Sequence, residues 1–201
     1  QNRQHHTGEE IPKAIGKVHF DQELLVNVQP DRLNILDKLV TSMQFTEGEI
    51  KDVVVYSLKK FHDDRGWLAE LFRHDELDAE FYPAMSYISY TRPGVQRGPH
   101  EHVDQADLFC FIGPSTFKMM LWDNRPDSPT YNHMMTMYVG IDEPMAVVVP
   151  KGVVHGYKNV GDVDGMVINC PNRLYMGEGK REPIDEIRHE DDPDTIYRMD
   201  R

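Results

Sequence analysis

A series of short apolar runs extends along the chain from Asp52 to Cys170 and limits the folds that this sequence can adopt. The runs are rich in Val, Tyr, Phe and Met, and Gly, Pro, Asp or Asn interrupts the series roughly every 8 to 12 residues. We expect these runs to be β-strands, at residues 52–57, 67–73, 85–91, 107–112, 116–122, 134–139, 145–149, 155–160 and 165–170. No helix long enough for a parallel crossover separates them, so the pattern predicts an all-β fold, an antiparallel sandwich or jelly-roll barrel.

The first 50 residues follow a different pattern. Within residues 30–43 the apolar positions recur at helical spacing, at Leu33, Leu36, Leu39 and Val40. We therefore predict an N-terminal extension over residues 1–50 with one amphipathic helix, followed by the barrel domain over residues 51–201.

Composition excludes several classes of function. The chain has 201 residues and a formal charge of -12, which is the wrong sign for non-specific binding to nucleic acid phosphates. No apolar run is long enough to span a bilayer, so no membrane partner is expected. Cys110 and Cys170 are too few for a disulfide framework, and a cytoplasmic location is predicted.

Histidines are placed at two points where the chain enters a strand. The segment RGPHEH, residues 97–102, holds His100 and His102 one residue apart, and the turn PKG precedes the strand that begins with His155. Alternate residues of a strand share one face, so His100 and His102 are expected to point the same way, with His155 approaching from a neighbouring strand. Imidazoles suit proton transfer near neutral pH, and they are also common metal ligands.

These two segments are similar to the signature segments of the cupin superfamily, whose small jelly-roll barrels direct the corresponding side chains into a central cavity. A closer resemblance rests on five stretches in matching order and spacing: FHDDRGWLAELF (61–72), SYTRPGVQRGPH (89–100), WDNRPDSPTY (122–131), PKGVVHGY (150–157) and EDDPDTI (190–196). Together they resemble the dTDP-4-keto-6-deoxyhexose 3,5-epimerases over residues 52–197. The resemblance implies an isomerase of nucleotide-sugar metabolism, in which a ketone acidifies the protons on the adjacent carbons and a base removes one of them.

The resemblance also implies roles for catalytic residues. His100 matches the family's base, and Asp192 matches the carboxylate that orients this base. His155 matches a second cavity histidine, near the ketone oxygen. A sister group, the dTDP-sugar 3,4-ketoisomerases, is similar in carrying His-x-His, which gives His102 an assisting role in proton transfer.

Substrate binding is implied for three further residues. Arg65, Glu70 and Arg97 match residues that hold the nucleotide and the diphosphate, and a guanidinium suits that anion because it binds two oxygens at once. The expected partner is a nucleotide sugar. A homodimer is also expected, because jelly rolls of this family cover their edge strands against a second copy.

Several positions depart from the family pattern. Ile168 stands where the family has a tyrosine that donates a proton, and Ala106 stands where it has a lysine that stabilises the enolate. Met85 and Pro99 also differ from the family, and Tyr175 supplies a phenol only if the chain runs differently after Cys170. We therefore expect a related reaction, such as ketone migration, or a different sugar.

A metal centre is the alternative. His100, His102 and His155 together would suit Zn, Fe, Mn or Ni, which would make the chain an oxygenase or isomerase of a small metabolite. Metal-binding cupins usually add a glutamate at the position of Ala106, and strand alternation would point the adjacent Asp107 to the opposite face. The first hypothesis needs no cofactor, whereas this one needs one divalent ion; a sugar-binding module without turnover is a further alternative.

Overall fold

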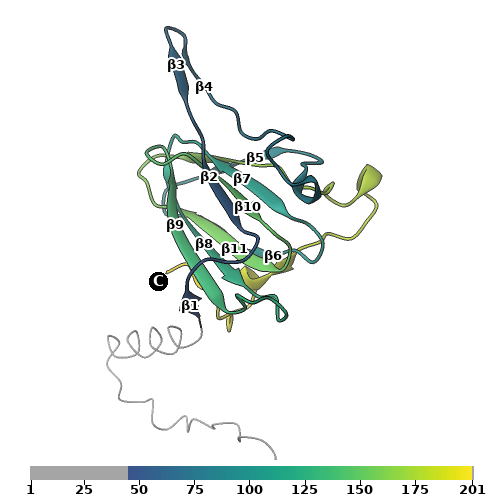
Figure 1. The fold of residues 1–201 in the computed structure, drawn as a ribbon. Helices are drawn as coiled ribbons and strands as arrows, with labels where there is room; N and C mark the ends of the chain where they lie inside the picture. Colours follow the sequence, from purple (N-terminus) through teal and green to yellow (C-terminus); the bar gives the residue numbers. More distant parts are fainter. Residues whose placement is uncertain (1–44, 201) are drawn as a thin grey trace, which may run out of the picture. The chain divides into compact units, whose positions relative to one another are not determined.

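The computed structural model describes residues 45–200, which form two facing β-sheets and a protruding hairpin (Figure 1). The six-stranded sheet has the order β1-β9-β8-β11-β6-β13, and the five-stranded sheet has the order β2-β10-β7-β12-β5. The predicted helix within residues 30–43 lies outside the described residues. Among the described residues no helix is long and apolar enough to cross a bilayer.

The strands of the six-stranded sheet are β1 (Thr46–Glu47), β6 (Gln96–Glu101), β8 (Thr116–Asp123), β9 (His133–Gly140), β11 (Val153–Asn159) and β13 (Ile187–Arg188). The strands of the five-stranded sheet are β2 (Val54–Ser57), β5 (Tyr87–Thr91), β7 (Asp107–Phe111), β10 (Met145–Val149) and β12 (Gly165–Asn169). The hairpin consists of β3 (Phe61–Asp63) and β4 (Gly66–Leu68). Three short 3-10 helices complete the described part, at Ala79–Phe81, Glu178–Lys180 and His189–Asp191.

The two sheets pack face to face, as the predicted jelly roll requires. Their inner faces meet in one apolar cluster that includes Phe111 of β7, Phe117 of β8 and Val147 of β10, all fully buried. Every strand pair is antiparallel except β1 with β9, which is parallel. The all-β prediction is therefore confirmed, with one short parallel edge that the sequence pattern did not indicate.

Residues 67–73 were expected to form one strand, and this expectation is wrong. Only Gly66–Leu68 is a strand, and the chain then crosses the outer face of the five-stranded sheet. There Leu71 and Phe72 pack against a second apolar cluster that contains Leu108 and Cys110 of β7. Ala69, Leu71 and Phe72 are thus partly buried by covering a sheet and not by joining one, whereas Trp67 and Leu68 stay exposed on the hairpin.

Both ends of the described chain pack on the barrel. Phe45, Tyr197 and Met199 are buried in a third apolar cluster with Trp122 of β8. Ile50 belongs to the main core. The barrel domain therefore includes residues 45–50, which the sequence pattern had grouped with the N-terminal extension.

Candidate active site

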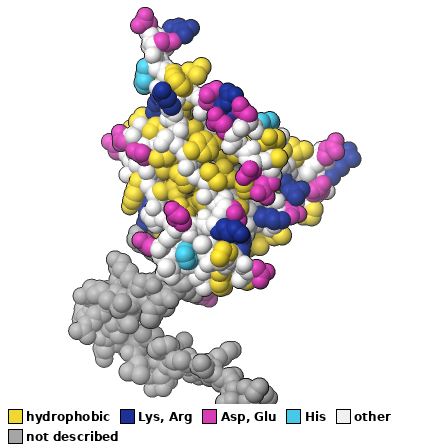
Figure 2. Space-filling model, in the orientation of Figure 1, with side chains coloured by type: hydrophobic (Ala, Val, Ile, Leu, Met, Phe, Trp, Pro, Cys, Tyr) yellow, Lys and Arg dark blue, Asp and Glu magenta, His cyan; other side chains and the backbone are white. Residues whose placement is uncertain are grey.

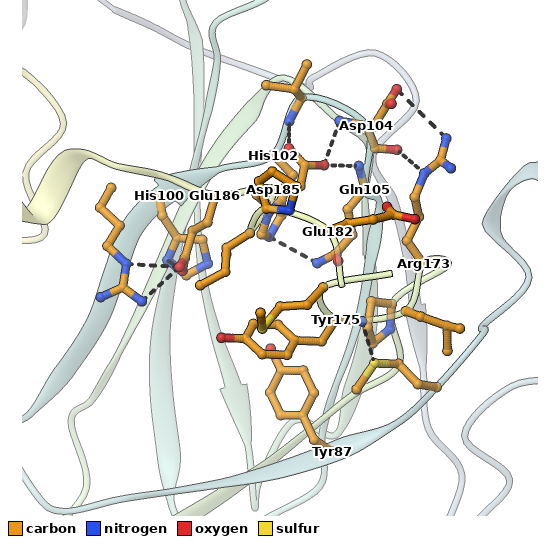
Figure 3. A pocket seen from close by; sticks show the side chains of 18 of the residues that line it. Tyr87, His100, His102, Asp104, Gln105, Arg173, Tyr175, Glu182, Asp185 and Glu186 are labelled. Atoms are coloured by element: carbon orange, nitrogen blue, oxygen red, sulfur yellow. Dashed lines mark hydrogen bonds and ion pairs between the residues drawn. The ribbon is translucent and has the colours of Figure 1, made fainter. Parts of the chain in front are cut away.

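A cavity of about 1270 Å³ opens at one end of the barrel (Figure 3). One side is formed by β5, β6 and the residues after β6. The other side is formed by the segment between residues 171 and 190, which folds over the opening. His100 and His102 line this cavity, and His155 lies behind them with only 2% of its surface exposed.

The three histidines come together because β6 and β11 are hydrogen-bonded neighbours. His155 of β11 is paired directly with His100 of β6, and their ring centroids are 4.5 Å apart. The His102 ring lies 5.5 Å from that of His100 and 5.6 Å from that of His155. Each ring offers a nitrogen atom, and the three atoms lie within 4.8 Å of one another, which is close enough to share a metal ion or a proton relay.

Gly98 makes this close pairing possible. Its φ is +77°, a left-handed conformation that favours glycine, and a Cβ atom there would lie 2.6 Å from the carbonyl oxygen of His155. The same atom would lie 3.1 Å from Nδ1 of His100. The glycine of the RGPHEH segment therefore allows β6 to approach β11 at the two histidines.

Asp107 is a site residue that the sequence reasoning placed on the wrong face. It is 2% exposed, and its Oδ2 atom lies 3.0 Å from Nε2 of His102 and 3.3 Å from Nε2 of His155. Along β7 it shares its face with Phe109 and Phe111, whose rings lie in the inner core, whereas Ala106 packs on the outer face. Neighbouring residues of β7 do point to opposite faces, as expected, but Asp107 points inward and Ala106 points outward.

The Nδ1 atoms of His155 and His102 make hydrogen bonds to backbone carbonyl oxygens. Nδ1 of His155 donates to the carbonyl oxygen of Val153 at 3.0 Å, and Nδ1 of His102 donates to that of Asp185. Each carbonyl can only accept, so both rings carry their proton on Nδ1 and turn Nε2 toward Asp107.

Two amides hold the other oxygen of Asp107. Its Oδ1 atom accepts hydrogen bonds from Nε2 of Gln105 at 3.0 Å and from Nδ2 of Asn169 at 2.9 Å. The carboxylate is therefore fixed in orientation, with Oδ2 directed at the two imidazoles.

The electrostatic environment differs among these groups. Burial by itself would lower the pKa of His102, but the adjacent Asp107 outweighs it, so the pKa of His102 is raised. Burial, reinforced by the neighbouring His100, lowers the pKa of His155. Burial by itself would raise the pKa of Asp107, but the two imidazoles outweigh it and hold that pKa well below its usual range. The carboxylate is therefore ionised and provides negative charge behind the cavity.

Two carboxylates lie beside His100, and neither of them is Asp192, the carboxylate expected from the sequence. Its Nδ1 atom lies 3.7 Å from Glu186 and 3.8 Å from Glu190. Although burial acts to raise it, the pKa of Glu190 is lowered because the His100 ring lies beside it. Asp192 is exposed, and its carboxylate accepts a hydrogen bond from the backbone of Asp194. The expected pairing of Asp192 with His100 is thus replaced by Glu186 and Glu190.

The predicted substrate-binding residues are divided between two places. Arg97 lines the cavity, where its guanidinium donates to Thr91 and to the carbonyl oxygen of Tyr90. Arg65 lies on the protruding hairpin with 89% of its side chain exposed, and Glu70 follows that hairpin. Neither Arg65 nor Glu70 lines the cavity in the described chain.

Of the other polar residues of the cavity, only Tyr175 was named from the sequence, as a conditional source of a phenol. Arg173, Lys180 and Arg188 add positive charge around the opening, and Figure 3 shows the rings of Tyr87 and Tyr175 inside it. They lie on loops and edge strands whose sequences carry no recognisable spacing. These residues come together only in the folded chain, where residues 171–190 line the cavity opposite β5 and β6.

Ile168 packs on the outer face of the five-stranded sheet, so it does not replace the proton donor inside the barrel. The next residue, Asn169, points inward and donates to the hydroxyl of Tyr87 at 2.8 Å. Burial raises the pKa of Tyr87 to about 12, which keeps this phenol protonated. The cavity therefore contains a phenol even though the expected position lacks one.

A jelly-roll barrel with clustered histidines facing one large cavity defines a cupin-type site for a small molecule. The chain belongs to the dTDP-4-dehydrorhamnose 3,5-epimerase family, because the model of this family matches residues 47–192. The resemblance inferred from the sequence motifs is thereby confirmed.

Curated relatives are consistent with this assignment. The chain is 40% identical over 128 residues to the probable low-salt glycan biosynthesis epimerase Agl13 of Haloferax volcanii, a match that covers 63% of this chain and 81% of the relative. It is 37% identical over 140 residues to the spore coat polysaccharide biosynthesis protein SpsL of Bacillus subtilis, covering 68% and 91%.

Solved structures show the same fold. A dTDP sugar isomerase from Desulfovibrio desulfuricans G20 aligns with a TM-score of 0.60 at 20% identity, covering 69% of this chain and 84% of that one. The 3,5-epimerase RmlC from Legionella pneumophila, solved in complex with dTDP-4-keto-L-rhamnose, also aligns with a TM-score of 0.60 at 20% identity, covering 71% and 74%.

Proposed function

We propose that this chain is an isomerase of a 4-keto nucleotide sugar, either an epimerase or a ketoisomerase, which moves a proton on a carbon beside the ketone. The observation that carries the proposal is the position of His100. Its ring lines the cavity, and Glu186 and Glu190, which also line it, lie 3.7 and 3.8 Å from its Nδ1 atom. A base backed by carboxylates in a cavity large enough for a sugar nucleotide suits the abstraction of a proton from a carbon acid.

His100 is proposed as the base. It would accept the proton from the carbon next to the ketone and become an imidazolium, whose charge Glu186 and Glu190 would stabilise. The electrons left on the carbon would delocalise into the ketone oxygen as an enolate. Returning a proton to the opposite face of that carbon gives an epimer. Protonation of the former ketone carbon, with the hydroxyl proton of the neighbouring carbon passing to the former ketone oxygen, moves the ketone to that neighbour.

A tyrosine is proposed as the second proton carrier. Tyr87 and Tyr175 both line the cavity, and both rings point into it (Figure 3). Tyr87 is the better placed donor because Asn169 fixes its hydroxyl and burial keeps the phenol protonated. It would donate to the enolate and recover its proton from water.

The diphosphate is proposed to bind at the cationic side of the opening. Arg97, Arg173 and Lys180 line it, and their positive charges would pair with the two phosphates. Arg65 and Glu70 remain proposed contacts for the nucleotide. Because neither lines the cavity of its own chain, each would contact a nucleotide that is bound in the cavity of a second copy.

That requirement supports a homodimer. The hairpin β3–β4 protrudes from the barrel (Figure 1) and exposes Phe61, Trp67 and Leu68 by 47%, 50% and 65%. Figure 2 shows apolar side chains grouped on the face of the molecule below the hairpin. The edge strand β2 also exposes Val54 and Val55, by 45% and 40%. A second copy that covers this surface would bury the apolar residues and complete the sheet edge.

The dimer is tested by sedimentation of the full chain at micromolar concentration. We expect the mass of two chains, and we expect Trp67→Glu to shift the equilibrium to the monomer because it places a charge in the buried surface. Tyr138→Glu, on the exposed face of β9, should leave the mass unchanged. A wild-type monomer under these conditions would refute the dimer.

A reducing location, the cytoplasm, is proposed from the two cysteines. Cys110 and Cys170 are both buried free thiols, and neither is placed to form a disulfide within the described chain.

Solvent exchange tests the proposed reaction. The full chain is incubated in D₂O with 4-keto nucleotide sugars, and NMR follows the protons on the carbons beside the ketone. We expect deuterium to enter at one or both of these carbons, because the base exchanges its proton with solvent between turnovers. Tight binding of the sugar nucleotide with no exchange would show a binding module instead, and would refute the proposed reaction.

A further inference from the structure

We propose that Asp185 is a positioning residue, which fastens the segment over the cavity to the loop between β6 and β7 and thereby sets the directions of His102 and Glu186. The fastening stands on hydrogen bonds of the described chain. Its effect on turnover rests on the proposed function.

Asp185 makes hydrogen bonds to four consecutive residues of that loop. Its Oδ1 atom accepts the backbone N–H of Val103 at 2.8 Å. Its Oδ2 atom accepts those of Asp104 and Gln105 at 2.8 and 2.9 Å. Asp185 lies beside His102 (Figure 3), and its backbone carbonyl oxygen accepts the Nδ1 proton of that ring. One residue of the segment therefore holds the loop from its first residue onward.

The three backbone bonds need an ionised carboxylate. Burial acts to raise the pKa of Asp185, but the backbone N–H groups of Val103, Asp104 and Gln105 outweigh it and lower that pKa. A carboxylate can accept all three N–H groups, because each of its oxygens has two lone pairs. The amide of an asparagine has one accepting oxygen, and its NH₂ group would face an N–H donor.

The loop held in this way connects two members of the buried cluster. His102 lies at its start, and Asp107 begins β7 at its end, with Oδ2 3.0 Å from Nε2 of His102. Gln105, whose backbone N–H is bound by Asp185, donates its side-chain amide to Oδ1 of Asp107. The path of the loop decides how the imidazole and the carboxylate meet, and Asp185 fixes that path.

The next residue along the segment reaches the proposed base. Oε1 of Glu186 lies 3.7 Å from Nδ1 of His100, and Oε2 pairs with the guanidinium of Arg188 at 2.8 Å. Ile187 and Arg188 form β13, which pairs with β6. Glu186 therefore lies between the anchor at Asp185 and a paired strand, and both hold its carboxylate beside His100.

The first end of the segment is fastened independently of Asp185. The side chain of Asn172 accepts the backbone N–H of Ala106 and donates to the carbonyl oxygen of Glu80, both at 2.8 Å. Loss of the Asp185 carboxylate should therefore loosen the later part of the segment. The cation Arg173, next to Asn172, should stay at the opening.

Amide hydrogen exchange and histidine NMR test the anchor without substrate. In the full wild-type chain we expect slow exchange of the amides of Val103, Asp104 and Gln105. We also expect a separate signal from the Nδ1 proton of His102, which is assigned by its absence from His102→Gln. In Asp185→Ala the three amides should exchange faster by at least about tenfold, because each loses a hydrogen bond to a charged group. The His102 signal should shift or disappear.

The kinetics of deuterium uptake into a 4-keto nucleotide sugar separate positioning from binding. In Asp185→Ala we expect kcat to fall by about 10- to 100-fold, as a misplacement of about 1 Å can cause, with KM nearly unchanged. Asp185→Asn should lie between Asp185→Ala and the wild type in kcat and in amide exchange. It serves if circular dichroism shows that the alanine variant does not fold. Asp194→Asn, the same change at an exposed residue later in the chain, should match the wild type in every measurement.

Wild-type amide exchange and a wild-type His102 signal in both Asp185 variants would overturn the anchor. Faster amide exchange with unchanged kcat would overturn the positioning role and leave Asp185 as a structural contact. A rise in KM alone would also overturn it, since Asp185 would then serve binding. If the wild-type chain exchanges no 4-keto nucleotide sugar, the proposed function fails, whereas the amide and histidine signals still decide the anchor.

Discussion

His100→Asn is expected to lower the rate of deuterium uptake into a 4-keto nucleotide sugar by at least about 100-fold, the lower end of what a positioned general base contributes. Asparagine has nearly the shape of part of the imidazole ring, but it cannot accept a proton near neutral pH. Binding of the sugar nucleotide should change little, because the cationic residues of the opening are untouched. NMR in D₂O measures the first quantity and calorimetric titration measures the second.

The matched control is His62→Asn, which makes the same chemical change on the exposed hairpin. It should exchange at the wild-type rate, provided that the dimer is retained. Full exchange by His100→Asn would remove this histidine from the mechanism. The base would then have to come from the other cavity residues, of which Glu186 and Glu190 are the carboxylates beside the same position.

The fold could be predicted because strand signals are local. Continuous apolar runs such as residues 107–112 and 145–149 became β7 and β10, since one face of each strand fills the space between the two sheets and the other face is covered from outside. Residues 67–73 are also rich in apolar residues, and yet Ala69, Leu71 and Phe72 cover the outside of a sheet. Composition indicates that apolar residues of such a run will be buried, but it does not indicate whether the run will join a sheet or cover one.

The site could be predicted only in part. The residues His100, His102 and His155 are brought together as their strand positions indicated, because paired strands convert sequence spacing into fixed distances. Asp107 was missed because the loop between β6 and β7 sets which residue of β7 first points inward. A shift of one residue there exchanges the two faces of the strand.

Carboxylates and cations from outside the strands were the least predictable. Glu186 and Glu190 reach His100 through an irregular segment, in which no period relates sequence position to direction. Asp192 was chosen by motif alone, and it is exposed. Contacts made by a folded-over segment depend on its whole path, and short motifs do not determine that path.

The motif WDNRPDSPTY is architectural, and its centre is Asp123. This carboxylate is fully buried at the end of β8, and it accepts hydrogen bonds from the guanidinium of Arg125 at 2.8 and 2.9 Å. The hydroxyls of Ser128 and Thr130 each donate to it at 2.6 Å. One side chain therefore holds the whole corner between β8 and β9.

Asp123→Ala is expected to reduce the free energy of unfolding by about 3 kcal/mol at pH 7, because it leaves a partly buried guanidinium and two hydroxyls without their acceptor. Chemical denaturation measures this difference. Asp127→Ala, an exposed residue of the same corner, should change the free energy by no more than about 0.5 kcal/mol. A loss below about 1 kcal/mol for Asp123→Ala would show that the corner does not depend on this carboxylate.

The same variant should alter how stability depends on pH. Burial acts to raise the pKa of Asp123, but its bonds with Arg125, Ser128 and Thr130 outweigh this and lower that pKa from 3.8 to about 2. A carboxyl whose pKa is lower in the folded chain stabilises the fold above its unfolded pKa, and this contribution is lost as the pH falls toward 2. The stability difference between the wild type and Asp123→Ala should therefore shrink between pH 4 and pH 2. A difference that stays constant over this range would mean that the ionised form of Asp123 is not what holds the corner.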